Sequence, residues 1–121
     1  MRIEPVDERN SSWEDDTPRF RVYLFQGGDE PGHSWAASTY DVTGATVLDT
    51  IRWAEEQAGT EQLYAVALVV DLDGGSASRQ RGLVWILGVD ANLSRPTDAQ
   101  RNELAGMYAR RAKPLSRGKS F

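Results

Sequence analysis

Cysteine is absent from this chain of 121 residues, and histidine occurs once, at His33. The lack of cysteine excludes disulfides, thiolate metal sites, iron–sulfur clusters and cysteine nucleophiles. A single histidine also excludes a zinc site built from several histidines. The sequence therefore predicts a protein without a metal site and without a cofactor.

Long apolar runs and familiar catalytic motifs are missing as well. No stretch approaches the roughly 20 apolar residues that are needed to span a bilayer, and residues 1–8 lack the apolar centre of a signal peptide. The patterns GxSxG, GxxxxGKS/T and HExxH do not occur, so the commonest signatures of hydrolases, phosphate-binding loops and zinc proteases are absent. We expect a cytoplasmic protein with no membrane partner.

What is present is the composition of an ordinary globular protein. Hydrophobic residues make up 40% of the chain and charged residues 26%, and a chain of this length forms one domain. The net charge is −4, with 12 acidic and 5 basic side chains in residues 1–60 but 6 and 9 in residues 61–121. In an acidic protein, a basic C-terminal segment suits an acidic protein surface better than nucleic acid. Weak nucleic-acid binding through this segment is kept as an alternative.

Residues 1–18 show no periodicity and are dense in Glu and Asp. This composition predicts a loosely ordered acidic arm. Trp13 stands out in the arm, because a large apolar side chain gains free energy by leaving water. It either packs the arm onto the body or belongs to an acidic–aromatic segment that recognises a partner.

Four segments read as strands. Residues 19–26 alternate between an apolar and a mixed face, and residues 34–42 follow them after a glycine-rich turn, which predicts a hairpin. Residues 63–71 and 83–90 are apolar on both faces, which is typical of inner strands that are covered on two sides. We predict that these two runs form a long hairpin at the centre of the sheet.

Capping signals predict a helix over residues 46–58. Thr46 and Asp49 resemble a capping box, and the expected apolar stripe consists of Val47, Leu48, Ile51, Ala54 and Ala58. Trp53 falls on the far side of this helix, beside Arg52 and Glu56. Either the arm or the C-terminal tail covers it, or Trp53 contacts a partner.

A second helix is predicted over residues 97–112, where Thr97 and Gln100 again have the spacing of a capping box. Its apolar stripe is narrow. Residues 113–121 then form a basic tail, which we expect to be flexible.

The element order is therefore strand, strand, helix, strand, strand, helix, which indicates a single α+β domain over residues 19–112 with a four-stranded sheet. The stretch YDVTGATVLDTI, residues 40–51, resembles the strand-to-helix junction of β-grasp domains of the ubiquitin and ferredoxin kind. The resemblance implies a hairpin that leads into a capped helix. It implies no function, because the cluster cysteines and the Gly-Gly end of those families are missing here.

We interpret the chain as a small non-catalytic module that binds another protein, such as an adaptor, an inhibitor or an immunity-type protein. Tryptophan is common among interface anchors, and the candidate binding residues are Trp13, Arg52, Trp53 and Glu56. The alternative is a small-molecule-binding or enzymatic domain with a pocket between the sheet and the C-terminal helix. Its candidate residues are His33, Trp35, Asp41 and Trp85. A homodimer formed across an uncovered sheet face or edge is compatible with either function.

Overall fold

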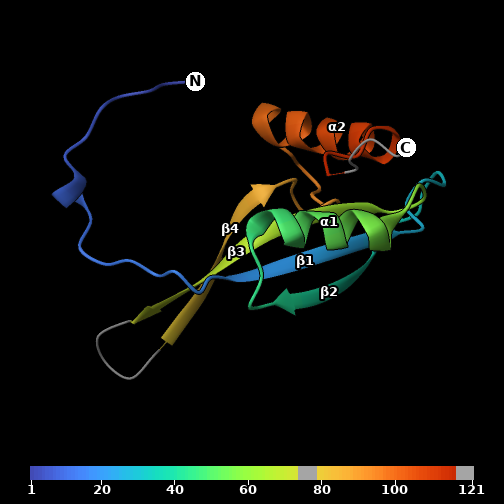
Figure 1. The fold of residues 1–121 in the computed structure, drawn as a ribbon. Helices are drawn as coiled ribbons and strands as arrows, with labels where there is room; N and C mark the ends of the chain where they lie inside the picture. Colours follow the sequence, from blue (N-terminus) through green and yellow to red (C-terminus); the bar gives the residue numbers. More distant parts are fainter. Residues whose placement is uncertain (74–78, 117–121) are drawn as a thin grey trace.

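Four strands and two helices follow one another in the predicted order (Figure 1). The computed structural model describes residues 1–73 and 79–116. The elements are η1 (Glu8–Asn10), β1 (Arg19–Gln26), β2 (Ala36–Val42), α1 (Val47–Ala58), β3 (Leu63–Asp73), β4 (Arg79–Leu87) and α2 (Asp98–Ala112). The predicted α+β class is confirmed, with boundaries that differ by a few residues. The end of the predicted tail, residues 117–121, lies outside the described residues.

The strands form one antiparallel sheet in the order β2-β1-β3-β4. β1 and β3 are the inner strands, and β4 is an edge strand. The interpretation of residues 83–90 as an inner strand is therefore wrong. Its apolar side chains suggested cover on both faces, but Val84 and Ile86 remain exposed in β4.

Helix α1 covers one face of the sheet because of how it is connected. It joins β2 to β3, which both pair with β1, so the chain crosses over β1 between them. Buried residues of α1 and β1 meet there, namely Ala54 and Ala58 against Phe20, Val22 and Leu24. The Thr46 side chain accepts a hydrogen bond from the Asp49 backbone N–H and begins the helix, as the capping signal predicts.

Helix α2 lies at the end of β3 that β4 does not reach. The last pair between these strands joins Val66 to Leu87, so the three residues of β3 before Val66 have no neighbour in β4. Met107 of α2 is buried there together with Leu63, Ala65 and Val89. Thr97 and Gln100 form the complete capping box that the sequence predicts.

The two helices lie on opposite faces of the sheet, because α1 packs on Tyr64 and Val66 of β3 whereas α2 packs on Leu63 and Ala65. Both helices lie over the same end of the sheet. The β3–β4 hairpin projects beyond them, and the N-terminal arm leaves from that projecting end (Figure 1). The lengths of the elements explain the overhang. A helix of 12 residues spans about 18 Å, whereas a strand of 11 residues spans about 36 Å. α1 therefore covers only part of β3.

Candidate protein-binding surface

Trp53 of α1 is half-buried against β2. Its ring meets that of Tyr40 edge-on, with the centroids 5.3 Å apart and an interplanar angle of 77°. The sequence predicts that either the arm or the tail covers Trp53, or that Trp53 contacts a partner. The side chain that packs against it belongs to strand β2 instead. Of the two neighbours predicted to share a binding site with Trp53, Arg52 lies 3.6 Å from Asp49 and Glu56 is exposed.

Trp13 is 70% exposed in the arm. It lines a cleft of about 340 Å³ together with Pro18, Leu68 and Val70. The cleft lies beside the part of β3 that extends past the start of β1, because the pairing of these strands begins at Arg19 and Val69. Trp13 therefore leaves much of its indole in water at the edge of a partly apolar cleft.

The four residues of the predicted pocket lie in different surroundings. His33 lines an open hollow of about 720 Å³, and its Nδ1 is 3.4 Å from the Glu30 carboxylate. Trp35 is buried, edge-on to Tyr108, and Asn92 bonds both its backbone N–H and its carbonyl oxygen. Within the described chain, none of the other three lines the hollow that holds His33.

Asp41 and Trp85 lie on the face of the sheet opposite α1. Arg21 donates a hydrogen bond of 2.7 Å to Asp41 and lowers the pKa of this carboxyl. The ring of Trp85 tilts against Tyr23 at 5.0 Å. Asp41 is thus paired within the sheet, and Trp85 packs against a neighbouring ring of the same face. The pocket that would unite them with His33 and Trp35 stays a prediction.

The hollow around His33 is closed on one side by Arg111 of α2. Its guanidinium donates to the Asp29 carboxylate at 2.8 Å and to the Glu61 carbonyl oxygen at 3.1 Å. The hydrogen bond lowers the pKa of Asp29. The hollow is thus lined by side chains that already pair with one another, which fits a structural tie between α2 and two loops.

The projecting half of the sheet carries an exposed apolar surface on the α1 side. Leu68 pairs with Val84, and Val70 pairs with Gly82, so these side chains and that of Leu72 point to one face. Leu72 is 56% exposed and Val84 53%. Leu68 and Val70 are half-buried. Neither α1 nor α2 covers this face in the part of the chain that the structure describes.

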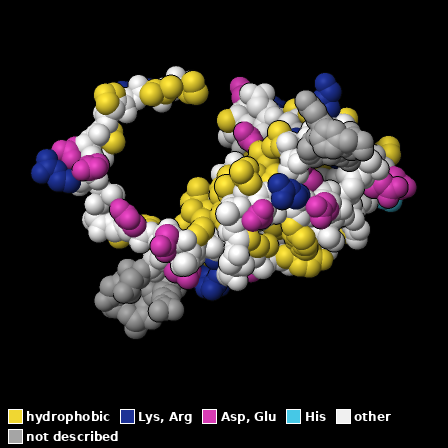
Figure 2. Space-filling view, in the orientation of Figure 1, with side chains coloured by type: hydrophobic (Ala, Val, Ile, Leu, Met, Phe, Trp, Pro, Cys, Tyr) yellow, Lys and Arg dark blue, Asp and Glu magenta, His cyan; other side chains and the backbone are white. Residues whose placement is uncertain are grey.

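Leu48 extends this surface from α1. It lies seven residues before Glu55, which bonds Tyr64 of β3, and residues seven apart share a helix flank. Leu48 therefore lies on the β3 side of α1 and is 68% exposed, although the sequence placed it in the buried stripe. Hydrophobic side chains gather over β4 and the start of α1 in Figure 2. We call this surface the β3–β4 patch, and it consists of Leu48, Leu68, Val70, Leu72 and Val84.

The patch continues into the cleft beneath Trp13, because Leu68 and Val70 line both. The sequence predicts Trp13 as a binding residue, but the residues of the patch carry no such prediction. A signal was available in the lengths of the predicted segments, since a 13-residue helix is too short to cover a 9-residue strand from end to end.

The chain matches no protein-family model, and comparisons with curated proteins and with solved structures found no significant match. The resemblance to β-grasp domains thus gains no support beyond the hairpin and the capped helix. Among the described residues, no helix is both long and apolar enough to cross a membrane.

Proposed function

We propose that this protein is a binding module that holds another protein chain on the β3–β4 patch. The observation that carries the proposal is the exposure of Leu72 and Val84 on one face of the β3–β4 hairpin, with Leu48 exposed on the side of α1 that faces β3. Soluble monomers seldom expose large contiguous apolar areas unless the area is an interaction site.

The surroundings of the patch support a protein partner. Trp13 lies at one end of the patch, in the cleft that Leu68 and Val70 line, and a tryptophan at the rim of an apolar groove is a common interface anchor. β4 is an edge strand, so its outer backbone groups are open to an added strand. The opposite edge strand, β2, carries the polar residues Ser38, Thr39 and Asp41. β2 is therefore less favourable than β4 for the addition of a strand from a partner.

The test compares two single variants of the full chain. Val84→Asp places a charge in the patch, and Thr39→Asp places the same charge at an exposed site on the other edge strand. Each tagged chain is used to capture proteins from its native lysate, and urea unfolding checks that both variants fold. We expect Val84→Asp to lose partners that Thr39→Asp retains. Identical partners for the two variants would contradict the proposal.

A further inference from the structure

The N-terminal arm neutralises most of the charges of its first half but not those at its base. Arg2 lies 2.7 Å from Glu4, and Arg9 lies 2.9 Å from Asp7. Three consecutive carboxylates follow at the base, in residues 14–16. In the part of the chain that the structure describes, none of these three forms an ion pair. The base of the arm therefore keeps its negative charge uncompensated.

The middle carboxylate of this run, that of Asp15, is held by neutral groups. It accepts a hydrogen bond of 2.8 Å from the Thr17 backbone N–H and one of 3.0 Å from the Thr17 hydroxyl. These bonds lower the pKa of Asp15, so its charge persists. Because Glu14 and Asp16 flank it, like charges lie close together, and a cation near them is attracted by all three.

This acidic base adjoins the β3–β4 patch. Asp15 lines the same cleft of about 340 Å³ as Trp13, and Leu68 and Val70 of the patch line it too. Apolar groups and a carboxylate therefore share one concave surface. Trp13 remains 70% exposed beside them, so its ring is open to a partner.

Other charges at the cleft do not cancel the acidic base. Asp71 and Arg19 also line the cleft, and Arg81 lies 2.7 Å from Asp71. Four carboxylates, those of Asp71 and residues 14–16, thus accompany two guanidinium groups. The net charge of these six side chains is −2.

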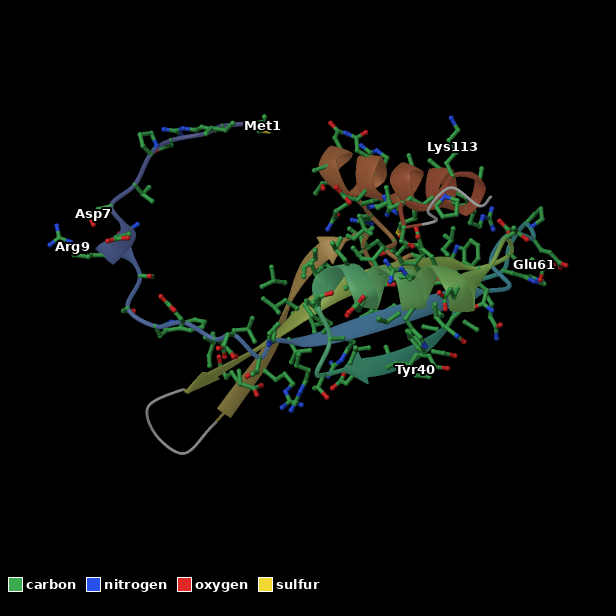
Figure 3. All side chains as sticks on the ribbon, in the orientation of Figure 1. Met1, Asp7, Arg9, Tyr40, Glu61 and Lys113 are labelled. Carbon is green, nitrogen blue, oxygen red and sulfur yellow. The ribbon has the colours of Figure 1, made fainter. Side chains whose placement is uncertain are left out.

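The basic residues at the end of α2 do not reach this acidic base. Lys113 lies at the end of the molecule away from the arm (Figure 3), and Arg111 pairs with Asp29. Acidic side chains follow the arm down to the sheet in Figure 2. Within the described chain this charge stays unbalanced, which favours a partner that brings its own cations.

We propose that the segment which binds the β3–β4 patch is both apolar and basic. The inference rests on the proposed function, because it names the chemistry of the partner of the same patch. Apolar side chains of the segment cover Leu72 and Val84, and its lysine or arginine side chains lie against the carboxylates of residues 14–16. Trp13 suits such a partner, because an indole ring attracts a cation as well as apolar groups. The net negative charge disfavours nucleic acid at this surface.

Synthetic peptides as long as the nine residues of β4 test this chemistry. Two basic probes combine leucine with lysine, one with leucine at every second position and one with leucine at helical spacing. Each has an acidic counterpart in which glutamate replaces lysine. We expect at least one basic probe to bind the full chain at least tenfold more tightly than its counterpart, measured by fluorescence anisotropy of the labelled peptide. Equal binding within both pairs, or no binding of either basic probe, would overturn the proposal.

Two charge variants locate the cations of the probe. Glu14→Gln with Asp16→Asn removes two charges and leaves the hydrogen bonds of Asp15 in place. We expect the basic probe to bind this variant at least fivefold more weakly at low salt. Glu56→Gln with Glu61→Gln removes the same charge at exposed sites elsewhere and should change the affinity less than twofold. An equal loss in both variants would show that only the overall charge matters and would refute the assigned contact.

A third variant tests the apolar contact without adding charge. Leu72→Ser with Val84→Ser should weaken binding of the basic probe at least tenfold, because both side chains are exposed parts of the patch. Urea unfolding checks that the variant folds. Unchanged affinity in a folded variant would place the probe elsewhere and overturn the proposal.

Two other occupants of the patch give different results. If the arm of the same chain covers the patch, Ile3→Ser with Val6→Ser frees it and raises the affinity for the basic probe at least tenfold. If a second copy covers it, the unaltered chain sediments at twice its mass of 13.4 kDa, and Leu72→Ser with Val84→Ser sediments at the single mass. Either result would overturn the proposal.

The outcomes also separate this inference from the proposed function. If Val84→Asp loses captured partners that Glu14→Gln with Asp16→Asn retains, and no basic probe binds, the assigned chemistry is wrong and the binding function stands. If neither the captured partners nor the probes depend on the patch, both are wrong.

Discussion

The carboxylate of Glu55 accepts a hydrogen bond of 2.8 Å from the backbone N–H of Ser116, a residue 61 positions further along the chain. The Ser116 hydroxyl and the Leu115 backbone N–H also donate to it. On its other side it accepts a hydrogen bond of 2.7 Å from the Tyr64 phenol. One side chain in α1 therefore joins β3 to the segment that follows α2. The start of the predicted flexible tail is held in place by it.

Replacement of Glu55 by glutamine should loosen this junction. An amide accepts through one oxygen only and carries no charge, so two of the four donors lose their partner. We expect the free energy of unfolding to fall by about 1 kcal/mol, a modest value because the site is partly open to water. The measurement is urea unfolding of Glu55→Gln beside Glu56→Gln, whose side chain is exposed. An equal loss in both variants would contradict the role of Glu55.

The same junction should respond to acid. Burial alone would raise the pKa of Glu55, but the hydrogen bonds from Ser116, Tyr64 and Leu115 lower it below its ordinary value of 4.5. The folded protein then binds this proton less readily than the unfolded chain. The stabilisation is complete above about pH 5 and is lost as the pH falls through the lowered pKa. Urea unfolding from neutral pH to below pH 4 should show the difference between the unaltered chain and Glu55→Gln shrinking. A stability difference that does not change with pH would show that the ionised Glu55 carboxylate does not stabilise the fold.

Tyr64 should remain a donor over this whole range. Burial raises the pKa of its phenol, and the hydrogen bond to Glu55 raises it further. The hydroxyl is therefore protonated at every pH in the experiment, so the acid response belongs to the carboxyl group.

The contact between Trp53 and Tyr40 should stabilise α1 against β2. Trp53→Ala removes a half-buried indole, and we expect the free energy of unfolding to fall by about 1–3 kcal/mol. Tyr40→Ala should have a smaller effect. Because the rings meet edge-on, the double variant should show a coupling of about 0.5–1 kcal/mol. Thr39→Ala, on the other face of the same strand, is the control. Strict additivity would show that the rings do not interact.

Gly88 should tolerate no side chain. Its φ is +82°, and an added Cβ would lie 3.0 Å from the Cβ of Ala65 and 3.1 Å from the Cγ of Met107. Gly88→Ala should therefore lower the free energy of unfolding by about 2–3 kcal/mol. Gly82→Ala is the matched control, because no atom lies within 4 Å of its added Cβ and its φ is ordinary. We expect Gly82→Ala to be neutral or slightly stabilising in thermal unfolding. Similar losses in both variants would refute the packing of α2 against Ala65.

Most of the secondary structure was predictable, because its signals are local. The side chains of Thr46 and Thr97 each accept a hydrogen bond from a backbone N–H three residues on, so both helix starts can be read from a few letters. The alternation of residues 19–26 likewise depends only on neighbours in the chain. The position of β4 at the edge of the sheet was not predictable in this way. An apolar pattern within one strand does not specify which other strands pair with it.

The candidate surface was predicted only in part. Trp13 and Trp53 drew attention because their sequence neighbours are charged. The structure then distinguishes them, because the ring of Tyr40 packs against Trp53, whereas Trp13 is 70% exposed among the described residues. Tyr40 and Trp53 lie 13 residues apart on different elements, and their contact depends on how α1 crosses the sheet.

By itself, the sequence determined the order of the elements, the caps of both helices, the acidic arm and the absence of cysteine chemistry. These properties arise from composition or from residues within about four positions of each other. Only the tertiary structure decided that β4 is an edge strand, that α2 lies at the end of β3 that β4 does not reach, and that Leu48, Leu72 and Val84 are exposed rather than buried. Each of these depends on which distant segments pair and how far each element reaches. Long-range pairing is the property that local sequence patterns do not encode.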